Sequence, residues 1–382
     1  MDRDQALYEE VKTIRRDLHE MPELAFDLPK TSAYIKDKLV SYGFVPISVA
    51  HTGWVVHIEG QIKEAVAFRA DMDGLPVKEA TGVSFASKHE GQMHACGHDG
   101  HMAMLLGFAK VLSKRKREDL PKSVVLVFQP AEEGPGGAKI IMEDGILEKL
   151  MVKSIFGFHL YPGLEEGQVG LCKGPFMARN GEFDLKIKGR SAHAGQPEEG
   201  IDALMAGAKI LGAIKELRSL WTNPLAPSVV HVGKFIGGSA RNIVAGEALL
   251  EGTLRAFDVK TYEMLKNELS NIARGITTLS SCEVHLTIRD FYQEVYNDPL
   301  LCDHIVDLLE PSEWTTLKPL MLAEDFSFYQ EKIPGVFLFL GTRNEEKDYV
   351  YPLHHEKFQF EERVLLKGVE VFLRLLMGTH VA

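Results

Sequence analysis

Nine consecutive residues, Met93-His94-Ala95-Cys96-Gly97-His98-Asp99-Gly100-His101, hold one thiol, three imidazoles and one carboxylate. These are the side chains that bind transition metals, and two glycines allow the backbone to turn tightly around them. Residues 102–112 follow as an apolar-rich segment, which we expect to be a helix. The stretch therefore indicates a metal site on a loop that opens a helix.

Two other interpretations of this stretch stay open at this point. Cys96 could be a thiol nucleophile with a histidine as its base. It could also be a small buried side chain beside histidines that face solvent. A thiol nucleophile can be distinguished from a metal site, because its activity would survive chelation and be lost on alkylation.

A second candidate is the carboxylate pair Glu132 and Glu133, which follows Phe128-Gln129-Pro130-Ala131. Adjacent residues of an extended segment point to opposite sides, so one carboxylate could bind a metal while the other faces a water. This division of labour suits metal-assisted hydrolysis, in which a free carboxylate takes a proton from water and passes it on. A pair of surface acids is the simpler alternative.

Short apolar runs at residues 65–68, 123–128 and 155–158 each precede ionisable groups. Strands of this kind are buried on both faces, as in a mostly parallel sheet covered by helices. Ligands bind beyond the carboxyl ends of such strands. We therefore expect Asp71 and Asp73, the glutamate pair, and His159 to converge on the loop that holds Cys96.

Residues 178–290 have a different pattern, because Phe183, Leu185 and Ile187 alternate with charges. Their expected order, β-α-β-β-α-β, is that of the split βαβ or ferredoxin-like module. The apolar pattern then returns with a strand near residues 336–340. We expect an α/β catalytic domain in two parts, residues 1–177 and 291–382, interrupted by a small lid or dimerisation domain.

The composition is that of a globular protein, with 382 residues, 45% hydrophobic and 25% charged, and a net charge of −11. This charge, without a basic stripe, argues against a nucleic-acid partner. We also expect no membrane span, because no apolar run approaches the roughly 20 residues required. The four cysteines are scattered and the N-terminus lacks a signal peptide's apolar core, so we expect a cytoplasmic protein.

With Leu353-His354 added, these motifs resemble those of the N-acyl-amino-acid amidohydrolases. This branch of the dinuclear aminoacylase and carboxypeptidase G superfamily includes hippurate hydrolase, indole-acetyl-amino-acid hydrolases and N-acetyldiaminopimelate deacetylase. The resemblance runs from Arg15-Arg16-Asp17-Leu18-His19 through Ala323-Glu324-Asp325-Phe326. It implies a homodimeric enzyme that hydrolyses N-acyl amino acids with two divalent ions, zinc or manganese, with cobalt and nickel as further candidates.

The resemblance also implies a role for each site residue. The implied metal ligands are Cys96 as the bridge, His98, Glu133, His159 and His354, with His355 as the alternative to His354. Glu132 would be the general base, with Asp71 and Asp73 supporting the ligands. In the small domain, His193 and Asn242 would stabilise the oxyanion and contact substrate, and Arg255 would pair with a substrate carboxylate.

The sequence departs from the family pattern near His193. Ser191-Ala192 stands where many relatives carry Gly-Gly, and the following segment lacks the Pro-His pair of the diaminopimelate-specific deacetylases. That narrower activity is therefore an alternative, as is a dipeptidase-type metallo-exopeptidase. A non-catalytic metal-binding protein is a third alternative, although it would have no need of a spare carboxylate beside the water.

Overall fold

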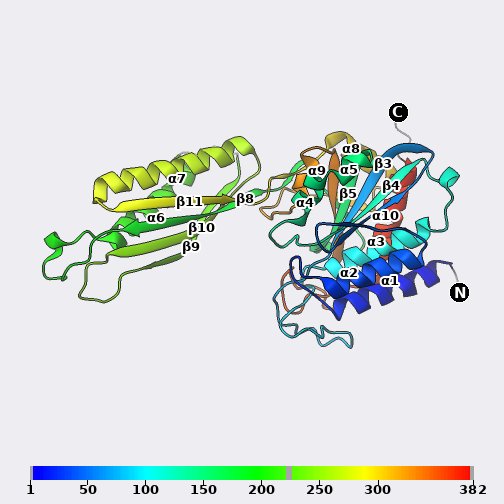
Figure 1. Cartoon of the computed structure of the whole chain (residues 1–382), viewed down its shortest axis with the longest axis horizontal. Helices are drawn as coiled ribbons and strands as arrows, with labels where there is room; N and C mark the ends of the chain where they lie inside the picture. Colours follow the sequence, from blue (N-terminus) through cyan, green and yellow to red (C-terminus); the bar gives the residue numbers. More distant parts are fainter. Residues whose placement is uncertain (1–2, 221–225, 379–382) are drawn as a thin grey trace. The chain divides into compact units, whose positions relative to one another are not determined.

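The computed structural model describes residues 3–220 and 226–378, and the chain forms two compact units. Unit 1 comprises Met1–Gly174, Tyr296–Lys318 and Asp325–Ala382. Unit 2 comprises Pro175–Val295 and Pro319–Glu324. The first and the last described helices, α1 and α10, both belong to unit 1 (Figure 1), so that unit 2 is an insertion in its sequence.

The centre of unit 1 is an eight-stranded sheet in the order β1-β2-β4-β3-β5-β14-β6-β13. Strand β3 pairs in parallel with β4 and β5, β14 pairs in parallel with β5, and β13 with β6. The strands are β1 (Ile47–Val49), β2 (Gly53–Ile58), β3 (Ile62–Asp71), β4 (Lys122–Gln129), β5 (Val152–Glu165), β6 (Val169–Leu171), β13 (Trp314–Thr316) and β14 (Gly335–Arg343). The mainly parallel sheet predicted from the apolar runs is confirmed.

Helices cover both faces of this sheet, with α1, α2 and α3 on one side and α4, α5 and α9 on the other (Figure 1). At Gly107 the first layer packs closely, because an added Cβ would lie 2.6 Å from Val11 of α1 and 3.2 Å from Val369 of α10. The helices of unit 1 are α1 (Arg3–His19), α2 (Pro29–Ser41), α3 (His98–Leu112), α4 (Gly137–Asp144), α5 (Ile146–Lys149), α8 (Pro299–Leu308), α9 (Ser327–Gln330) and α10 (Leu365–Gly378), with 3-10 turns η1 (Arg117–Asp119) and η3 (Glu362–Val364).

One expected strand end is wrong. Strand β5 continues through His159 to Glu165, and His159 pairs with Phe339 of β14. Beyond His159 the strand changes from two covered faces to one, since Pro162 and Leu164 are buried and Gly163 is exposed. The expected end at residue 158 therefore marks a change in burial rather than the end of pairing.

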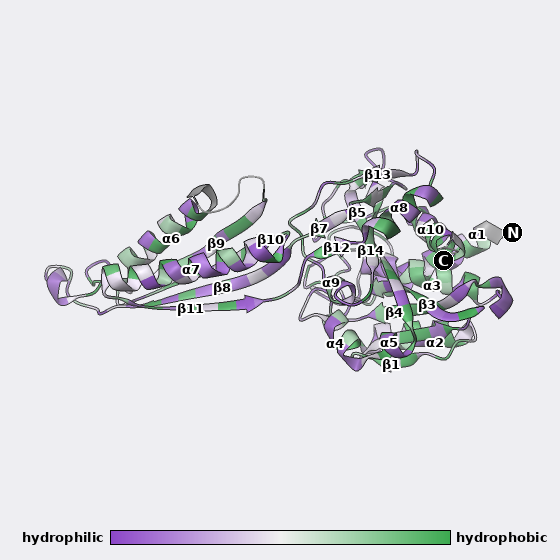
Figure 2. Ribbon diagram, turned by 90° about the horizontal axis from the view of Figure 1, so that it is seen from above, coloured by the Kyte–Doolittle hydropathy of each residue, from purple (hydrophilic) through white to green (hydrophobic). Residues whose placement is uncertain are grey.

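Unit 2 has the predicted β-α-β-β-α-β order and an antiparallel sheet ordered β11-β8-β10-β9. Phe183, Leu185 and Ile187 are buried against α6 and α7, which leaves the other face of the sheet uncovered by the described residues of this unit. Figure 2 shows hydrophilic and hydrophobic positions interleaved along α7, as expected for a helix with one buried face. The elements are β8 (Arg179–Lys188), η2 (Pro197–Glu199), α6 (Ala203–Leu220), β9 (Ser228–Gly237), β10 (Glu247–Ala256), α7 (Val259–Ser280) and β11 (Glu283–Asp290), and the short strands β7 (Gly174–Met177) and β12 (Val295–Asn297) flank them.

Among the described residues, no helix has both the length and the apolar character needed to cross a membrane.

Candidate metal centre

Cys96 lies between two histidines of unit 1. Its Sγ atom is 3.3 Å from Nε2 of His159 and 3.3 Å from Nε2 of His354. Gly97 follows with a φ of +88°, and an added Cβ there would lie 3.2 Å from Leu160. The turn between Cys96 and α3 therefore requires glycine both for its backbone conformation and for space.

Two sets of three potential metal ligands share this thiol. One set is Cys96, His98 and His159, and the other is Cys96, Glu133 and His354. In each set the three ligand atoms lie within 4.8 Å of one another. These two groups of sulfur, nitrogen and oxygen donors would suit two divalent transition metal ions.

The charges around His98 also fit a bound cation. Burial alone would lower the pKa of His98, but the carboxylates of Asp71, Asp73 and Glu133 raise it to about 10. Both ring nitrogens of His98 are buried without a hydrogen-bond partner. These carboxylates stabilise a cation at this position, and a divalent metal ion would provide one while giving one of the ring nitrogens a partner.

The surroundings of Cys96 do not favour a thiol nucleophile. Burial and the carboxylates of Glu133, Glu132 and Asp71 raise the pKa of the Cys96 thiol well above its ordinary value. A cysteine nucleophile needs the reverse, because only the thiolate attacks. A metal ion would stabilise the thiolate by direct bonding, so the geometry favours Cys96 as a ligand.

His159 presents an unprotonated nitrogen to Cys96. His159 donates a hydrogen bond from Nδ1 to the Leu160 carbonyl at 2.7 Å, which leaves the lone pair of Nε2 facing the sulfur. Burial lowers the pKa of His159 well below its usual range, so the ring is neutral as a ligand must be. His354 has a φ of +66° and also approaches Glu133, with 3.2 Å between Nε2 and Oε1.

His355, the alternative to His354, points elsewhere. Its ring stacks on Tyr351 with 4.7 Å between centroids, and its Nδ1 accepts a hydrogen bond from the Lys357 backbone. His101 is likewise occupied, since Nδ1 donates to Asp71 at 2.6 Å and Nε2 accepts from the Leu160 backbone at 2.9 Å. The structure therefore brings His354 to the thiol and assigns His101 to hydrogen bonding.

Asp73 holds the two glutamates in place. Its Oδ1 accepts the Glu132 backbone N–H at 3.0 Å, and its Oδ2 accepts that of Glu133 at 3.1 Å. Ala131 precedes the pair with a φ of +58°. Glu133 belongs to the second ligand set, while Oε2 of Glu132 lies 4.0 Å from Nε2 of His98. One buried carboxylate thus fixes the turn that presents both side chains.

A buried polar network supports Asp71, and most of it was not predicted from the sequence. Arg69, 1% exposed, donates hydrogen bonds to Asp71 at 2.7 Å, Gln129 at 2.8 Å and Asp325 at 3.0 Å. Gln129 also donates to both oxygens of Asp325, at 2.8 and 2.7 Å. An arginine within a run of apolar strand residues was the available signal, because such a residue must find buried partners.

Within unit 2 the structure brings together two of the three predicted substrate residues. The Ala194 backbone donates to the Asn242 carbonyl at 2.9 Å, so the exposed His193 and Asn242 are neighbours. Arg255 lies near the opposite end of β10, where its guanidinium donates to the Met321 carbonyl at 2.7 Å. The span of β10 from Glu247 to Arg255 is roughly 26 Å at a rise of about 3.3 Å per residue.

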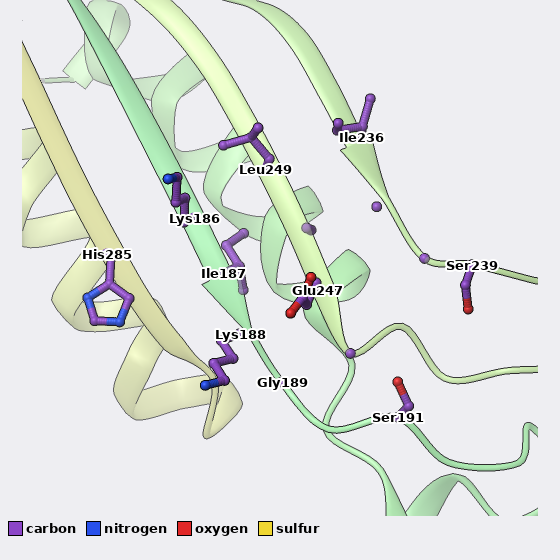
Figure 3. A pocket seen from close by; sticks show the side chains of 14 residues that line it. Lys186, Ile187, Lys188, Gly189, Ser191, Ile236, Ser239, Glu247, Leu249 and His285 are labelled. Atoms are coloured by element: carbon purple, nitrogen blue, oxygen red, sulfur yellow. The ribbon is translucent and has the colours of Figure 1, made fainter.

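A separate hollow of about 880 Å³ lies on the uncovered face of the unit 2 sheet. Figure 3 shows Lys186 and Lys188 on β8, Glu247 on β10 and His285 on β11 around it. Among the described residues, no candidate metal group includes a side chain of this hollow. The predicted metal ligands all lie in unit 1.

The comparisons with known proteins agree with this geometry. Residues 67–378 match the profile of peptidase family M20/M25/M40, and the chain belongs to this family. It is 38% identical over 370 residues to an Arabidopsis thaliana protein named IAA-amino acid hydrolase ILR1-like 4, a match that covers 94% of this chain and 83% of the relative. It is 35% identical over 369 residues to the N-acetyldiaminopimelate deacetylase of Bacillus licheniformis, covering 95% and 96%.

A solved structure gives the same result for the fold. The YXEP protein of Bacillus subtilis, described as a dinuclear metal binding peptidase of the M20 family, superposes with a TM-score of 0.84 and 31% identity. The match covers 97% of this chain and 98% of that one. The protein described here is accordingly a metal-dependent amidohydrolase of the M20 family, and the resemblance stated from its motifs is confirmed.

Proposed function

We propose that this enzyme hydrolyses the amide bond of N-acyl amino acids and releases a carboxylic acid and an amino acid. The observation that carries the proposal is the pair of ligand sets sharing Cys96, with the carboxylate of Glu132 beside them. Bound at these sets, two divalent ions would polarise the amide carbonyl and lower the pKa of a water. Zinc and manganese are the leading candidates, and cobalt and nickel also suit a sulfur, nitrogen and oxygen donor set.

Glu132 is the residue to which we assign proton transfer. Its carboxylate takes a proton from the attacking water and returns it to the leaving nitrogen, so that the amine departs neutral. Asp73 holds the Glu132 backbone and thereby limits the positions that this carboxylate can occupy. The other glutamate, Glu133, remains a ligand.

Replacing the base tests this assignment. Glu132→Gln keeps the side-chain volume and is expected to bind both ions while turnover falls about 100-fold or more. Metal content by elemental analysis and turnover of N-acetyl-L-methionine are the measurements. Retained turnover would remove Glu132 from the role, whereas loss of metal would mean that it is a ligand.

The positions of His193 and Arg255 support a homodimer. His193 lies beside Asn242, beyond the Glu247 end of β10, whereas Arg255 lies near the other end. The length of this strand exceeds that of an N-acetyl amino acid, so His193 and Arg255 could contact one substrate only if they come from two chains. In a symmetric dimer each site would then use one residue from each lid. The exposed apolar side chains of Leu204 and Met205, on α6, provide surface for such an association.

Mixing two inactive variants tests the arrangement. Glu132→Ala and His193→Ala, mixed under conditions that exchange subunits, should regain about a quarter of the wild-type activity through hybrid dimers. Each variant alone is the control. No recovery in mixtures that contain hybrid dimers would show that His193 acts within its own chain, and activity of His193→Ala alone would show that it is not required.

The substrate proposal is tested on chelated enzyme with manganese or zinc added back. Restored hydrolysis of N-acetyl-L-methionine or hippurate supports the aminoacylase-like activity. Preference for N-acetyldiaminopimelate would favour the deacetylase alternative, for which the B. licheniformis relative is named, and preference for free dipeptides would favour an exopeptidase. We also propose a cytoplasmic location, because all four cysteines are free thiols.

A further inference from the structure

A second set of buried charges in unit 1 belongs to neither ligand set. Arg15 and His19 of α1 and Asp99 of α3 are at most 1% exposed. Nε of Arg15 and Nδ1 of His19 each lie 2.8 Å from Oδ2 of Asp99, and the other ring nitrogen of His19 is 3.2 Å from Glu79. Burying charges has a large desolvation cost, and ion pairs often fail to recover this cost. Net stabilisation is therefore a weak explanation for the cluster.

Asp99 is placed where it can control the first ligand segment. It directly follows His98 in the first turn of α3. Successive side chains of a helix point about 100° apart, so His98 can face the other ligands while Asp99 faces α1. Contact between Asp99 and α1 thus fixes the direction of this turn, and with it the positions of His98 and Cys96.

Arg15 links the same turn to the second ligand segment. Its guanidinium lies 4.6 Å from the ring of Phe360, and its Nη1 is 3.5 Å from Oε1 of Glu362. Both residues are on the segment that follows His354. An added Cβ at Gly100 of α3 would lie 2.9 Å from Phe360, so this ring also packs directly on the helix that Asp99 opens.

We propose that Arg15 and Asp99 are positioning residues that hold the His98 and His354 segments in register, so that the shared ligand Cys96 meets both. The inference rests on the ligand set proposed above. Its consequence is a preformed site, in which metal binding does not have to order two segments from opposite parts of the chain. Replacing outer partners of this kind typically weakens metal affinity about 10- to 100-fold.

The test uses Co²⁺ as the probe, because a thiolate–cobalt bond gives a charge-transfer band. The metal-free full-length protein is titrated with Co²⁺ against a competing chelator, and its thermal unfolding is recorded without metal. The double variant Arg15→Met/Asp99→Leu removes both charges of the pair, so that neither is left buried without the other. It is expected to bind Co²⁺ about 10- to 100-fold more weakly.

Arg16→Met is the matched control. Arg16 is on the same helix and contacts Glu362 at 2.8 and 2.6 Å, but its partner is not Asp99. Its Co²⁺ affinity is expected to stay within about threefold of the wild type, because the Arg16 side chain is 38% exposed and does not reach Asp99. Arg15→Lys supplies a second variant, because one ammonium cannot replace the fork that reaches Asp99 and Glu362 together. It should lose affinity several-fold while remaining folded.

Two results would overturn the inference. One is a folded double variant or Arg15→Lys variant that binds Co²⁺ within about threefold of the wild type. The other is failure of both variants to fold, which would confine the pair to a role in folding. Cys96→Ser separates this inference from the ligand assignment. An unchanged charge-transfer band in Cys96→Ser would refute the ligand set, whereas a lost band with unaffected Arg15 variants would refute only the positioning role.

Discussion

Asp73→Asn is the substitution that most directly tests how the turn that presents Glu132 and Glu133 is held in place. Asparagine has one acceptor oxygen where aspartate has two, so only one of the Glu132 and Glu133 backbone N–H groups keeps a partner. The other N–H would face an amide NH₂ group. Because Asp73 is 1% exposed, water cannot easily replace the lost acceptor.

The size of the expected effect follows from the loss of one acceptor oxygen. A hydrogen bond to a charged group contributes about 1.5–3 kcal/mol, and leaving a buried donor unsatisfied costs about the same. If the turn moves to recover this loss, Glu132 leaves its position beside His98, and we expect kcat to fall about 10- to 100-fold with a smaller change in KM. Turnover of N-acetyl-L-methionine and metal content, measured on the same samples, are the assays.

Asp37→Asn on the exposed surface of α2 is the matched control and should leave both parameters unchanged. The reasoning is refuted if Asp73→Asn retains its kcat within about threefold while binding metal normally. In that case the Glu132 turn would be held by its own backbone conformation, and the two hydrogen bonds would be incidental to catalysis.

The remaining predictions concern stability. Gly137→Ala should lower the free energy of unfolding by about 1–3 kcal/mol or more, because its Cβ would lie 1.9 Å from a backbone carbonyl oxygen. Gly212→Ala on α6, where nothing lies within 4 Å, should raise it by up to about 1 kcal/mol, and denaturant titration measures both. Burial raises the pKa of Glu313, but hydrogen bonds from Lys367 and Arg374 lower it to about 2, against 4.5 for the free side chain. The stability that Glu313 supplies is therefore complete above pH 4.5 and lost as the pH falls toward 2, so wild-type and Glu313→Gln unfolding curves should converge in acid. Chelation should lower Tm, and a metal at 100 times its Kd should restore about 2.7 kcal/mol; an unchanged Tm would mean that no ion binds the native state selectively.

The sequence predicted those parts of the site that follow from sheet geometry. Glu133 follows a parallel strand, and Cys96 lies in the loop that opens the helix packed on that sheet, so their convergence needed no knowledge of side-chain packing. The two hydrogen bonds that Asp73 accepts were not predictable, because they depend on the backbone N–H groups of Glu132 and Glu133 turning toward one carboxylate. The long extension of β5 was missed because pairing with β14, far away in sequence, continues where the apolar pattern stops.

The distance between His193 and Arg255 was missed for a related reason. Both lie in lid motifs of the resembled family, and the motifs alone do not reveal that they are at opposite ends of a sheet. Strand register settles that question, since Arg255 pairs with Asn180 at the start of β8 while Glu247 pairs with Lys188 at its end. A motif identifies the residues that could act together, but the sheet decides whether one chain can supply them to one substrate.

The connectivity of unit 1 adds a constraint on when the metal site can form. Strand β14 lies between β5 and β6, and the His354 backbone donates to the Ala95 carbonyl at 2.9 Å. The segment that carries His354 therefore joins Cys96 only after the chain has passed through unit 2 and returned. Because the second ligand set needs both segments, full metal binding should report completed folding of unit 1. A chain truncated before β14 should keep at most the Cys96, His98 and His159 set, so it should bind fewer ions than the whole protein.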